Sequence, residues 1–227
     1  MELGGNAPII VLEDADLDVA VEGAIVAKMP NIGEACTAAN RFYVHRAKAE
    51  VFTNRLTARM AALKVGNELD EGIDVGPLVN ADARDKVALV EDALAKGAEL
   101  RLGGKLPNGP GFYPPTVLFG VPDSADCVHE QIFGPVAAVQ TFLDEEDVIA
   151  RANDTEYGLV AYVFTGNLKR GLNVSEQLEY GMIGLNRGLV SDPAAPFGGV
   201  KQSGLEREGG HEGMLEFMET QYISTNW

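Results

Sequence analysis

The sequence has little cysteine, little histidine and few basic side chains for its 227 residues. Its two cysteines, Cys36 and Cys127, lie far apart and form no Cys-x-x-Cys pair, so we expect neither a disulfide framework nor a redox dithiol. A reducing compartment is the simplest setting, and we predict a cytoplasmic location. The three histidines, His45, His129 and His211, lie in no recognisable hydrolase context, which disfavours a Cys–His hydrolase. We predict no metal site.

The charge balance is acidic, with 34 Asp and Glu against 18 Lys and Arg and a net charge of −16. No Lys/Arg cluster stands out, so we expect no nucleic-acid partner. The longest apolar run, residues 7–12, is far too short to span a bilayer, and no signal peptide is evident, so we expect no membrane partner. Acidity of this kind mainly favours solubility.

Strand and helix patterns alternate along the chain, which predicts an α/β fold with an open, mostly parallel sheet and helices on both faces. Asp14 or Asp16 is placed to cap the first helix. A loop is expected over residues 65–79, and an ordered Gly/Pro-rich loop near a site over 193–208. Strands are expected at 8–12, 42–45, 98–102, 116–120, 136–142, 160–165, 182–185 and 219–225, and helices at 17–25, 51–63, 83–96, 145–153 and 168–178.

Cys36 is the first candidate for chemistry. A lone cysteine is more often a small buried hydrophobe than a nucleophile. Here small residues flank it on both sides, which would let a substrate approach, and nearby backbone N–H groups could stabilise a thiolate or an oxyanion. Glu2 stands beside two glycines, and taken alone it would be read as a solvated loop acid. A glycine-rich turn before a buried strand usually has structure ahead of it, which suggests a fragment.

Four segments, in order and spread over the whole chain, together resemble the aldehyde dehydrogenase family. Each is weak alone, but their order and spacing make the resemblance specific. The sequence around residues 179–184 and 188–191 is most similar to the succinate-semialdehyde dehydrogenase branch. The four segments are Glu2-Leu3-Gly4-Gly5-Asn6, Gly33-x-x-Cys36 with Arg41, Ile132-Phe133-Gly134-Pro135, and Asn186 with residues 196–204.

The resemblance implies a mechanism that these residue types support. Cys36, as thiolate, would attack an aldehyde, a hydride would leave to the nicotinamide of NAD or NADP, and water activated by Glu2 would hydrolyse the thioester to the acid. Phe133 would pack by the nicotinamide. Phe197 would line the aldehyde tunnel, and Ser191 would help to hold a substrate carboxylate. The expected substrate is succinate semialdehyde.

The chain also departs from the family pattern at five positions, one of which is Glu206 in place of a usual Gly. Glu34 replaces the usual Gln, and Gln131 replaces a Glu that binds the nicotinamide ribose, which weakens a charge-assisted hydrogen bond. Pro30 stands where the succinate-semialdehyde branch often has an Arg that grips the substrate carboxylate, and Ala38 where that branch often has a second cysteine. These departures leave open a second hypothesis, a non-catalytic assembly module of the same fold.

The resemblance also implies a domain organisation. Residues 1–218 would form the catalytic domain, and residues 219–227 a C-terminal oligomerisation strand of a homodimer or homotetramer. The dinucleotide-binding domain and the oxyanion-stabilising Asn of the family would precede Glu2 and are absent from this chain. We therefore expect the chain alone to be inactive, and NAD or NADP preference to be set outside it.

Overall fold

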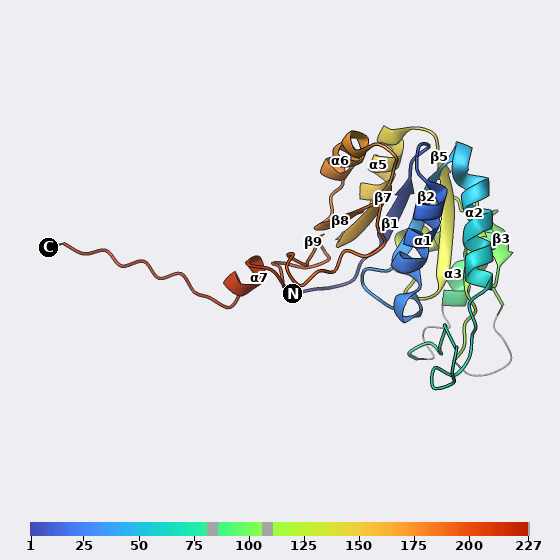
Figure 1. The fold of residues 1–227 in the computed structure, drawn as a ribbon, viewed down its shortest axis with the longest axis horizontal. Coiled ribbons are helices and arrows are strands. Elements are labelled where there is room, and N and C mark those ends of the chain that lie inside the picture. Colours follow the sequence, from blue (N-terminus) through green and yellow to red (C-terminus); the bar gives the residue numbers. More distant parts are fainter. Residues whose placement is uncertain (81–85, 106–110, 227) are drawn as a thin grey trace.

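The computed structural model describes residues 1–80, 86–105 and 111–226, and in that part of the chain seven strands pair into one sheet (Figure 1). The sheet order is β3-β4-β5-β2-β1-β7-β8, and every neighbouring pair is parallel except β3 and β4. This confirms the mostly parallel α/β sheet. The strands are β1 (Ala7–Val11), β2 (Ala39–His45), β3 (Glu99–Leu102), β4 (Thr116–Phe119), β5 (Val136–Phe142), β7 (Val160–Phe164) and β8 (Met182–Leu185).

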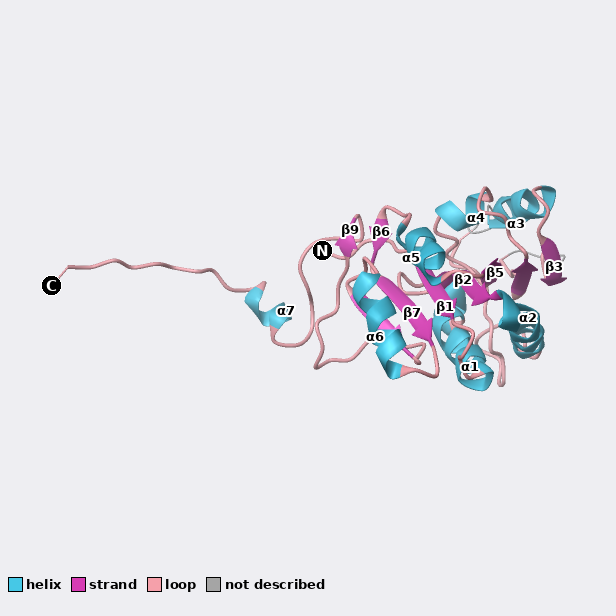
Figure 2. Cartoon of the chain, turned by 90° about the horizontal axis from the view of Figure 1, so that it is seen from above, coloured by secondary structure: helices cyan, strands magenta, loops and turns pink. Residues whose placement is uncertain are grey.

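Helices cover both faces of this sheet, as predicted. On one face, Ile9 and Val11 of β1 pack with α1 (Leu17–Lys28) and α2 (Arg46–Ala61). Ile10 points to the opposite face, because side chains alternate along a strand. That face is covered by α3 (Lys86–Ala95), α4 (Asp126–His129), α5 (Glu145–Asn153) and α6 (Leu168–Gln177). Figure 2 shows α3 and α4 across the sheet from α2. No helix in the described residues has the length and apolarity needed to cross a bilayer.

Most of the regular elements follow the predicted pattern. β5, α5 and β8 have the predicted bounds. Asp16 caps α1 by accepting from the N–H groups of Asp18 and Val19, whereas Asp14 accepts from the Thr165 hydroxyl. The helix predicted at 83–96 begins outside the described residues, and its described part ends at Ala95. Sequence patterns missed the shortest elements, namely η1 (Pro30–Gly33), α4, α7 (Glu212–Leu215), and the two-stranded sheet of β6 (Tyr157–Gly158) and β9 (Val200–Lys201).

The segment at 219–225, predicted to be an extended strand that pairs outside the domain's own sheet, belongs to no sheet in the described part of the chain. The segment is extended and leaves the body beyond α7, but no strand pairs with it in the described part of the chain (Figures 1 and 2). Strands need a partner because their backbone N–H and C=O groups are only satisfied across a ladder. The alternating pattern of the sequence therefore marks an extended segment and not a formed strand. Tyr222 is 87% exposed and Ile223 74% exposed.

Candidate active site

The first four residues are held in place by the loop that follows β9. The Leu3 N–H donates to the Ser203 carbonyl at 2.9 Å, and the Ser203 hydroxyl donates to the Gly4 carbonyl at 2.8 Å. Glu2 forms an antiparallel bridge with Gly204, whose φ of 121° and close approach to Met1 leave no room for a side chain. The position of Glu2 is therefore set by residues near the other end of the chain.

The segment that carries Glu2 lies directly against the segment that carries Cys36. A Cβ atom on Gly5 would lie 2.5 Å from the Cys36 carbonyl oxygen, so only glycine permits this approach. The Arg41 guanidinium then fixes the next residue, since its Nε and Nη2 donate to the Asn6 carbonyl at 3.0 and 2.8 Å. Glycine and arginine together hold the two segments side by side.

Arg41 is a buried cation, 1% exposed, whose guanidinium N–H groups donate to neutral oxygens. Besides the Asn6 carbonyl, it donates to the carbonyls of Arg151 and Ala152 and to the Tyr180 hydroxyl. Buried charges are tolerated when such hydrogen bonds replace the lost hydration. Arg41 thereby ties the start of β1, the end of α5 and Tyr180 into one unit behind the site.

Cys36 follows a left-handed turn. Asn31, Ile32 and Gly33 have φ values of 50°, 54° and 80°, and a side chain on Gly33 would clash with the Gly134 carbonyl. A β-branched residue such as Ile32 is rare in this conformation, and such strain is common at functional sites. Cys36 itself is half-buried in the turn after η1 and just before β2.

The Cys36 thiol is influenced by two carboxylates, those of Glu2 and Glu208. Burial, followed by the charge of Glu2, raises the pKa of Cys36, and the charge of Glu208 adds to this, while backbone N–H groups at Cys36 and Thr37 lower it. Partial burial raises the pKa of Glu2, and the neighbouring charge of Glu208 and a hydrogen bond with it raise that pKa further. Glu208 therefore acts on both Glu2 and Cys36. Glu208 lies in the loop predicted at 193–208, but sequence reasoning did not single it out.

Two cavities are walled by the turn around Cys36. A cavity of about 550 Å³ is lined by Asn31, Ile32, Glu34, Glu68, Gly76, Pro77, Val79 and Phe133. A smaller one, of about 50 Å³, is lined by Val26, Ala27, Pro30, Ala35, Thr37, Ala38, Tyr162 and residues 188–191, Ser191 among them. The residues between Pro30 and Ala38 contribute to both cavities. The nucleophile candidate thus lies on a turn shared by a large hollow and a small one.

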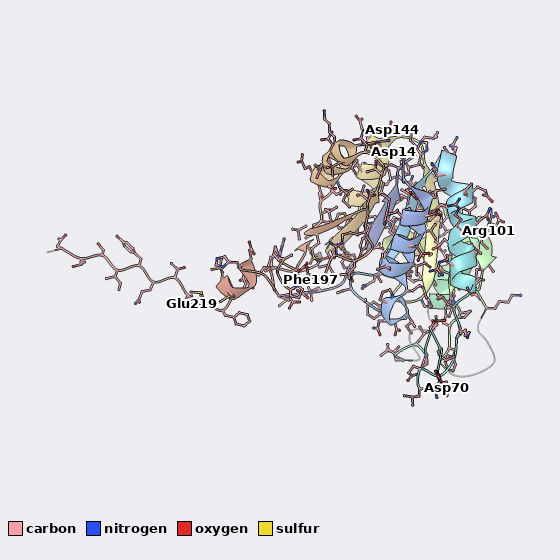
Figure 3. All side chains as sticks on the ribbon, in the orientation of Figure 1. Asp14, Asp70, Arg101, Asp144, Phe197 and Glu219 are labelled. Atoms are coloured by element: carbon pink, nitrogen blue, oxygen red, sulfur yellow. The ribbon has the colours of Figure 1, made fainter. Side chains whose placement is uncertain are left out.

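The remaining predicted site residues fall around this turn. Gln131 packs over Gly4, where an added Cβ would lie 2.9 Å from its Oε1. Phe197 is half-buried and exchanges two backbone hydrogen bonds with Glu208, at 2.7 and 2.8 Å. Figure 3 shows Phe197 at the base of the arm that carries Glu219. Tyr162 was missed by sequence reasoning, and its hydroxyl donates to the Thr37 carbonyl at 3.0 Å.

The other departures from the family pattern lie near these cavities. The Glu34 carboxylate is buried and accepts from the Val79 N–H at 3.1 Å. Pro30 is exposed at the small cavity, and Ala38 is buried in its wall. No group of His, Cys, Asp or Glu side chains in the described residues is arranged to hold a metal ion.

The fold and the site define an α/β protein with a cysteine and a carboxylate placed before two neighbouring parallel strands. The chain belongs to the aldehyde dehydrogenase family, whose model matches residues 1–223. This confirms the resemblance drawn from the four sequence segments.

Individual relatives agree with this placement. A succinate-semialdehyde dehydrogenase of Paenarthrobacter nicotinovorans is 56% identical over 98% of this chain and 50% of its own length. A glutarate-semialdehyde dehydrogenase of Pseudomonas putida is 49% identical over 98% of this chain and 46% of its own. The crystal structure of a succinate-semialdehyde dehydrogenase from Burkholderia pseudomallei superposes with a TM-score of 0.94 at 51% identity, covering 96% of this chain and 45% of that one. The chain thus spans about half the length of the relatives it matches.

Proposed function

We propose that this chain is the catalytic half of an NAD(P)-dependent aldehyde dehydrogenase that oxidises an aldehyde to an acid through a thioester on Cys36. The observation that carries the proposal is the direct contact between the Gly5 backbone and Cys36, which brings the Glu2 segment to the thiol. A module kept only for assembly would not need a strained turn, a half-buried thiol and a carboxylate of raised pKa in one place. This supports the enzyme over the non-catalytic alternative.

The roles follow from the chemistry of each group. The Cys36 sulfur forms the bond to the aldehyde carbon and is later the leaving group, which suits a thiolate in both steps. The raised pKa of Glu2 makes this carboxylate a better acceptor for a proton from the water that would hydrolyse the thioester. The charge of Glu208 and its hydrogen bond with Glu2 contribute to the raised pKa of Glu2. The backbone N–H groups at Cys36 and Thr37 favour negative charge at the sulfur.

The larger cavity fits the nicotinamide end of a dinucleotide. Phe133 offers an aromatic face there, with a φ of 49°, and Ile32 and Val79 add apolar wall. Phe133 would hold the ring, and Gln131 would hydrogen-bond the adjoining ribose from beside Gly4. When bound, the oxidised nicotinamide supplies the two-electron oxidation of the aldehyde. The relatives include an NADP-dependent succinate-semialdehyde dehydrogenase of Escherichia coli, which is 47% identical.

A small aldehyde is the proposed substrate, with succinate semialdehyde the first candidate. The names of the relatives support this class, and Ser191 and Phe197 are the proposed substrate contacts. We further propose the division into a catalytic domain over 1–218 and an oligomerisation segment over 219–227. Assembly into a homodimer or homotetramer and a cytoplasmic location remain predictions.

A hybrid enzyme tests the function. Residues 1–227 would replace the matching half of the Paenarthrobacter enzyme, and reduced dinucleotide would be followed with succinate semialdehyde. We expect turnover, which Cys36→Ala abolishes and Cys127→Ala leaves in place. Glu2→Gln is expected to give one equivalent of reduced cofactor and then to stall at the thioester. Full turnover by the Cys36→Ala hybrid would refute the proposal. The chain alone is expected to show no turnover.

A further inference from the structure

One buried hydroxyl connects the loop after β9 both to the Glu2 segment and to β6. The Ser203 side chain is fully buried. Its Oγ accepts a hydrogen bond from the Gly158 N–H at 2.9 Å and donates one to the Gly4 carbonyl at 2.8 Å. A hydroxyl has a single proton, so the proton that Ser203 carries is committed to the Gly4 carbonyl. The serine therefore joins two segments that are distant in the sequence.

Gly4 is the residue whose conformation this hydrogen bond restricts. It is the first of two successive glycines that lie between Glu2 and the contact with the Cys36 carbonyl. Glycines have no side chain to limit φ and ψ, so this stretch depends on outside contacts for a fixed conformation. The Leu3 N–H supplies another such contact by donating to the Ser203 carbonyl at 2.9 Å. One serine thus holds the segment through its backbone and through its side chain.

Ser203 is itself fixed by the small two-stranded sheet. β6 and β9 pair Gly158 with Val200, and the Ser203 N–H donates to the Val200 carbonyl at 3.2 Å. A Cβ atom on Gly199 would lie 2.6 Å from the Ser203 Cβ, so the serine packs directly against the backbone before it. The hydroxyl therefore has a defined position, from which it sets the position of the Glu2 segment.

We propose that Ser203 is a positioning residue for thioester hydrolysis, which acts through Gly4 to hold the Glu2 carboxylate within reach of the attacking water. The inference rests on the proposed function and concerns its second step. A carboxylate that acts as a base must lie within hydrogen-bond reach of the water, and a small displacement removes much of the rate. Thioester formation depends on the Cys36 sulfur, which neither hydrogen bond of the Ser203 hydroxyl involves.

An acetyl thioester tests the proposal on the chain as it is. p-Nitrophenyl acetate transfers its acetyl group to the Cys36 sulfur with release of p-nitrophenolate, and no dinucleotide is needed. Water then adds to the acetyl carbon, the C–S bond breaks, and acetate and the free thiol remain. After excess ester is removed, loss of the acetyl group from the peptide that contains Cys36 is followed by mass spectrometry. Acylation and hydrolysis are thereby timed separately.

We expect Ser203→Ala to acquire the acetyl group at the rate of the unchanged chain and to lose it about tenfold more slowly. Ser175→Ala is the matched control, because the Ser175 hydroxyl also donates to a glycine carbonyl, that of Gly171 at 2.7 Å inside α6. It should leave both rates unchanged. In a Glu2→Gln background, Ser203→Ala should slow hydrolysis by less than about twofold, since the base that the serine positions is already absent.

Three results would overturn the proposal. Ser203→Ala could hydrolyse the thioester at the unchanged rate, it could slow acylation and hydrolysis equally, as a general loosening of the fold would, or it could have its full effect in the Glu2→Gln background. An unchanged rate of hydrolysis in Glu2→Gln itself would instead remove the base from the proposed function, and the role of Ser203 with it.

Hydrogen exchange measures the positioning directly and needs no reaction at Cys36. Ser203→Ala should speed exchange several-fold at the Gly158 amide, which loses its acceptor, and at the Leu3 amide, whose segment is no longer held by the hydroxyl. Ser175→Ala should leave both amides unchanged, and circular dichroism confirms that each variant is folded. Unchanged exchange at Leu3 in Ser203→Ala would show that the hydroxyl does not hold the segment, and the proposal would fall.

Discussion

The two cysteines lie in two different environments of the same molecule, and comparing them shows what distinguishes a reactive thiol from a structural one. Cys127 lies in the four-residue helix α4, fully buried among the side chains of α3 and β5, and burial raises its pKa from 9.0 to about 12. Cys36 lies half-buried in a turn whose other residues line two cavities, and the charges of Glu2 and Glu208 act on it. Burial raises the pKa of both thiols, so the pKa alone does not distinguish them. The accessible cavities and the contact with the Glu2 segment set Cys36 apart.

The largest expected difference is in reactivity. Moving a thiol from a pKa of 9.0 to about 12 lowers its thiolate fraction at neutral pH about a thousandfold. We expect iodoacetamide to label the folded Cys127→Ala variant at Cys36 and to leave the folded Cys36→Ala variant almost unlabelled. Mass spectrometry over time measures both rates. Comparable labelling rates in the two variants would show that Cys36 is no more reactive than Cys127.

Crowding of the Cys36 backbone should give the next largest effect. In Gly5→Ala the new methyl would lie 2.5 Å from the Cys36 carbonyl, so the turn must shift. We expect a loss of about 1–3 kcal/mol in the free energy of unfolding and an altered labelling rate at Cys36. Gly76→Ala is the matched control, because its added methyl meets Glu68 at an ordinary 3.5 Å. Urea titration of both variants would reveal whether only Gly5 is sensitive.

Alkaline stability should report the buried thiol. The folded-state pKa of Cys127 is raised, so its contribution is present below about pH 9 and is lost as the pH rises towards about 12. In that window this one group lowers the free energy of unfolding by about 1.4 kcal/mol per pH unit. In Cys127→Ala, the free energy of unfolding should therefore fall less steeply with pH, by about 1.4 kcal/mol per pH unit in this window. The buried tyrosines titrate with the same sign but are present in both proteins, so the difference isolates the thiol.

The smallest expected effect comes from the carboxylates near Cys36. Glu2→Gln removes the neighbouring charge that contributes most to raising the Cys36 pKa, so the thiolate fraction at pH 8 should increase a few fold. Glu208→Gln should act in the same direction but less strongly. Labelling with iodoacetamide in a Cys127→Ala background measures both. A slower rate in Glu2→Gln would show that the charge of Glu2 is not what holds the thiol neutral.

The periodicity of apolar residues in the sequence was enough to predict the sheet and the helices that cover it. The apolar run at residues 7–12 and the alternation of strands with helices were enough to predict a mostly parallel sheet. The pairing of Glu2 with Cys36 in one mechanism came from family motifs, since no local pattern links residues so far apart. Glu208 and Tyr162 could not be found this way, because their roles arise from a backbone pairing with Phe197 and a hydrogen bond to Thr37.

The sequence also could not predict where the backbone adopts left-handed conformations or which extended segments remain unpaired. Asn31 and Ile32 adopt positive φ values although Ile favours strands, so tertiary contacts override local preference there. The segment 219–225 has a strand-like sequence but no partner in the described residues. Pairing depends on a second segment, and that information is not contained in the segment itself.

The pairing of Met1–Gly4 with residues 203–205 sets an order of events during synthesis. The segment bearing Glu2 emerges from the ribosome well before its hydrogen-bond partners at Ser203 and Leu205. Contacts between such distant positions close late in folding, because the loop they span must be ordered first. The sheet can therefore assemble before the Glu2 segment is fixed. Chains stalled at residue 198 should show Leu3 unprotected from hydrogen exchange while β1 and β2 are already protected.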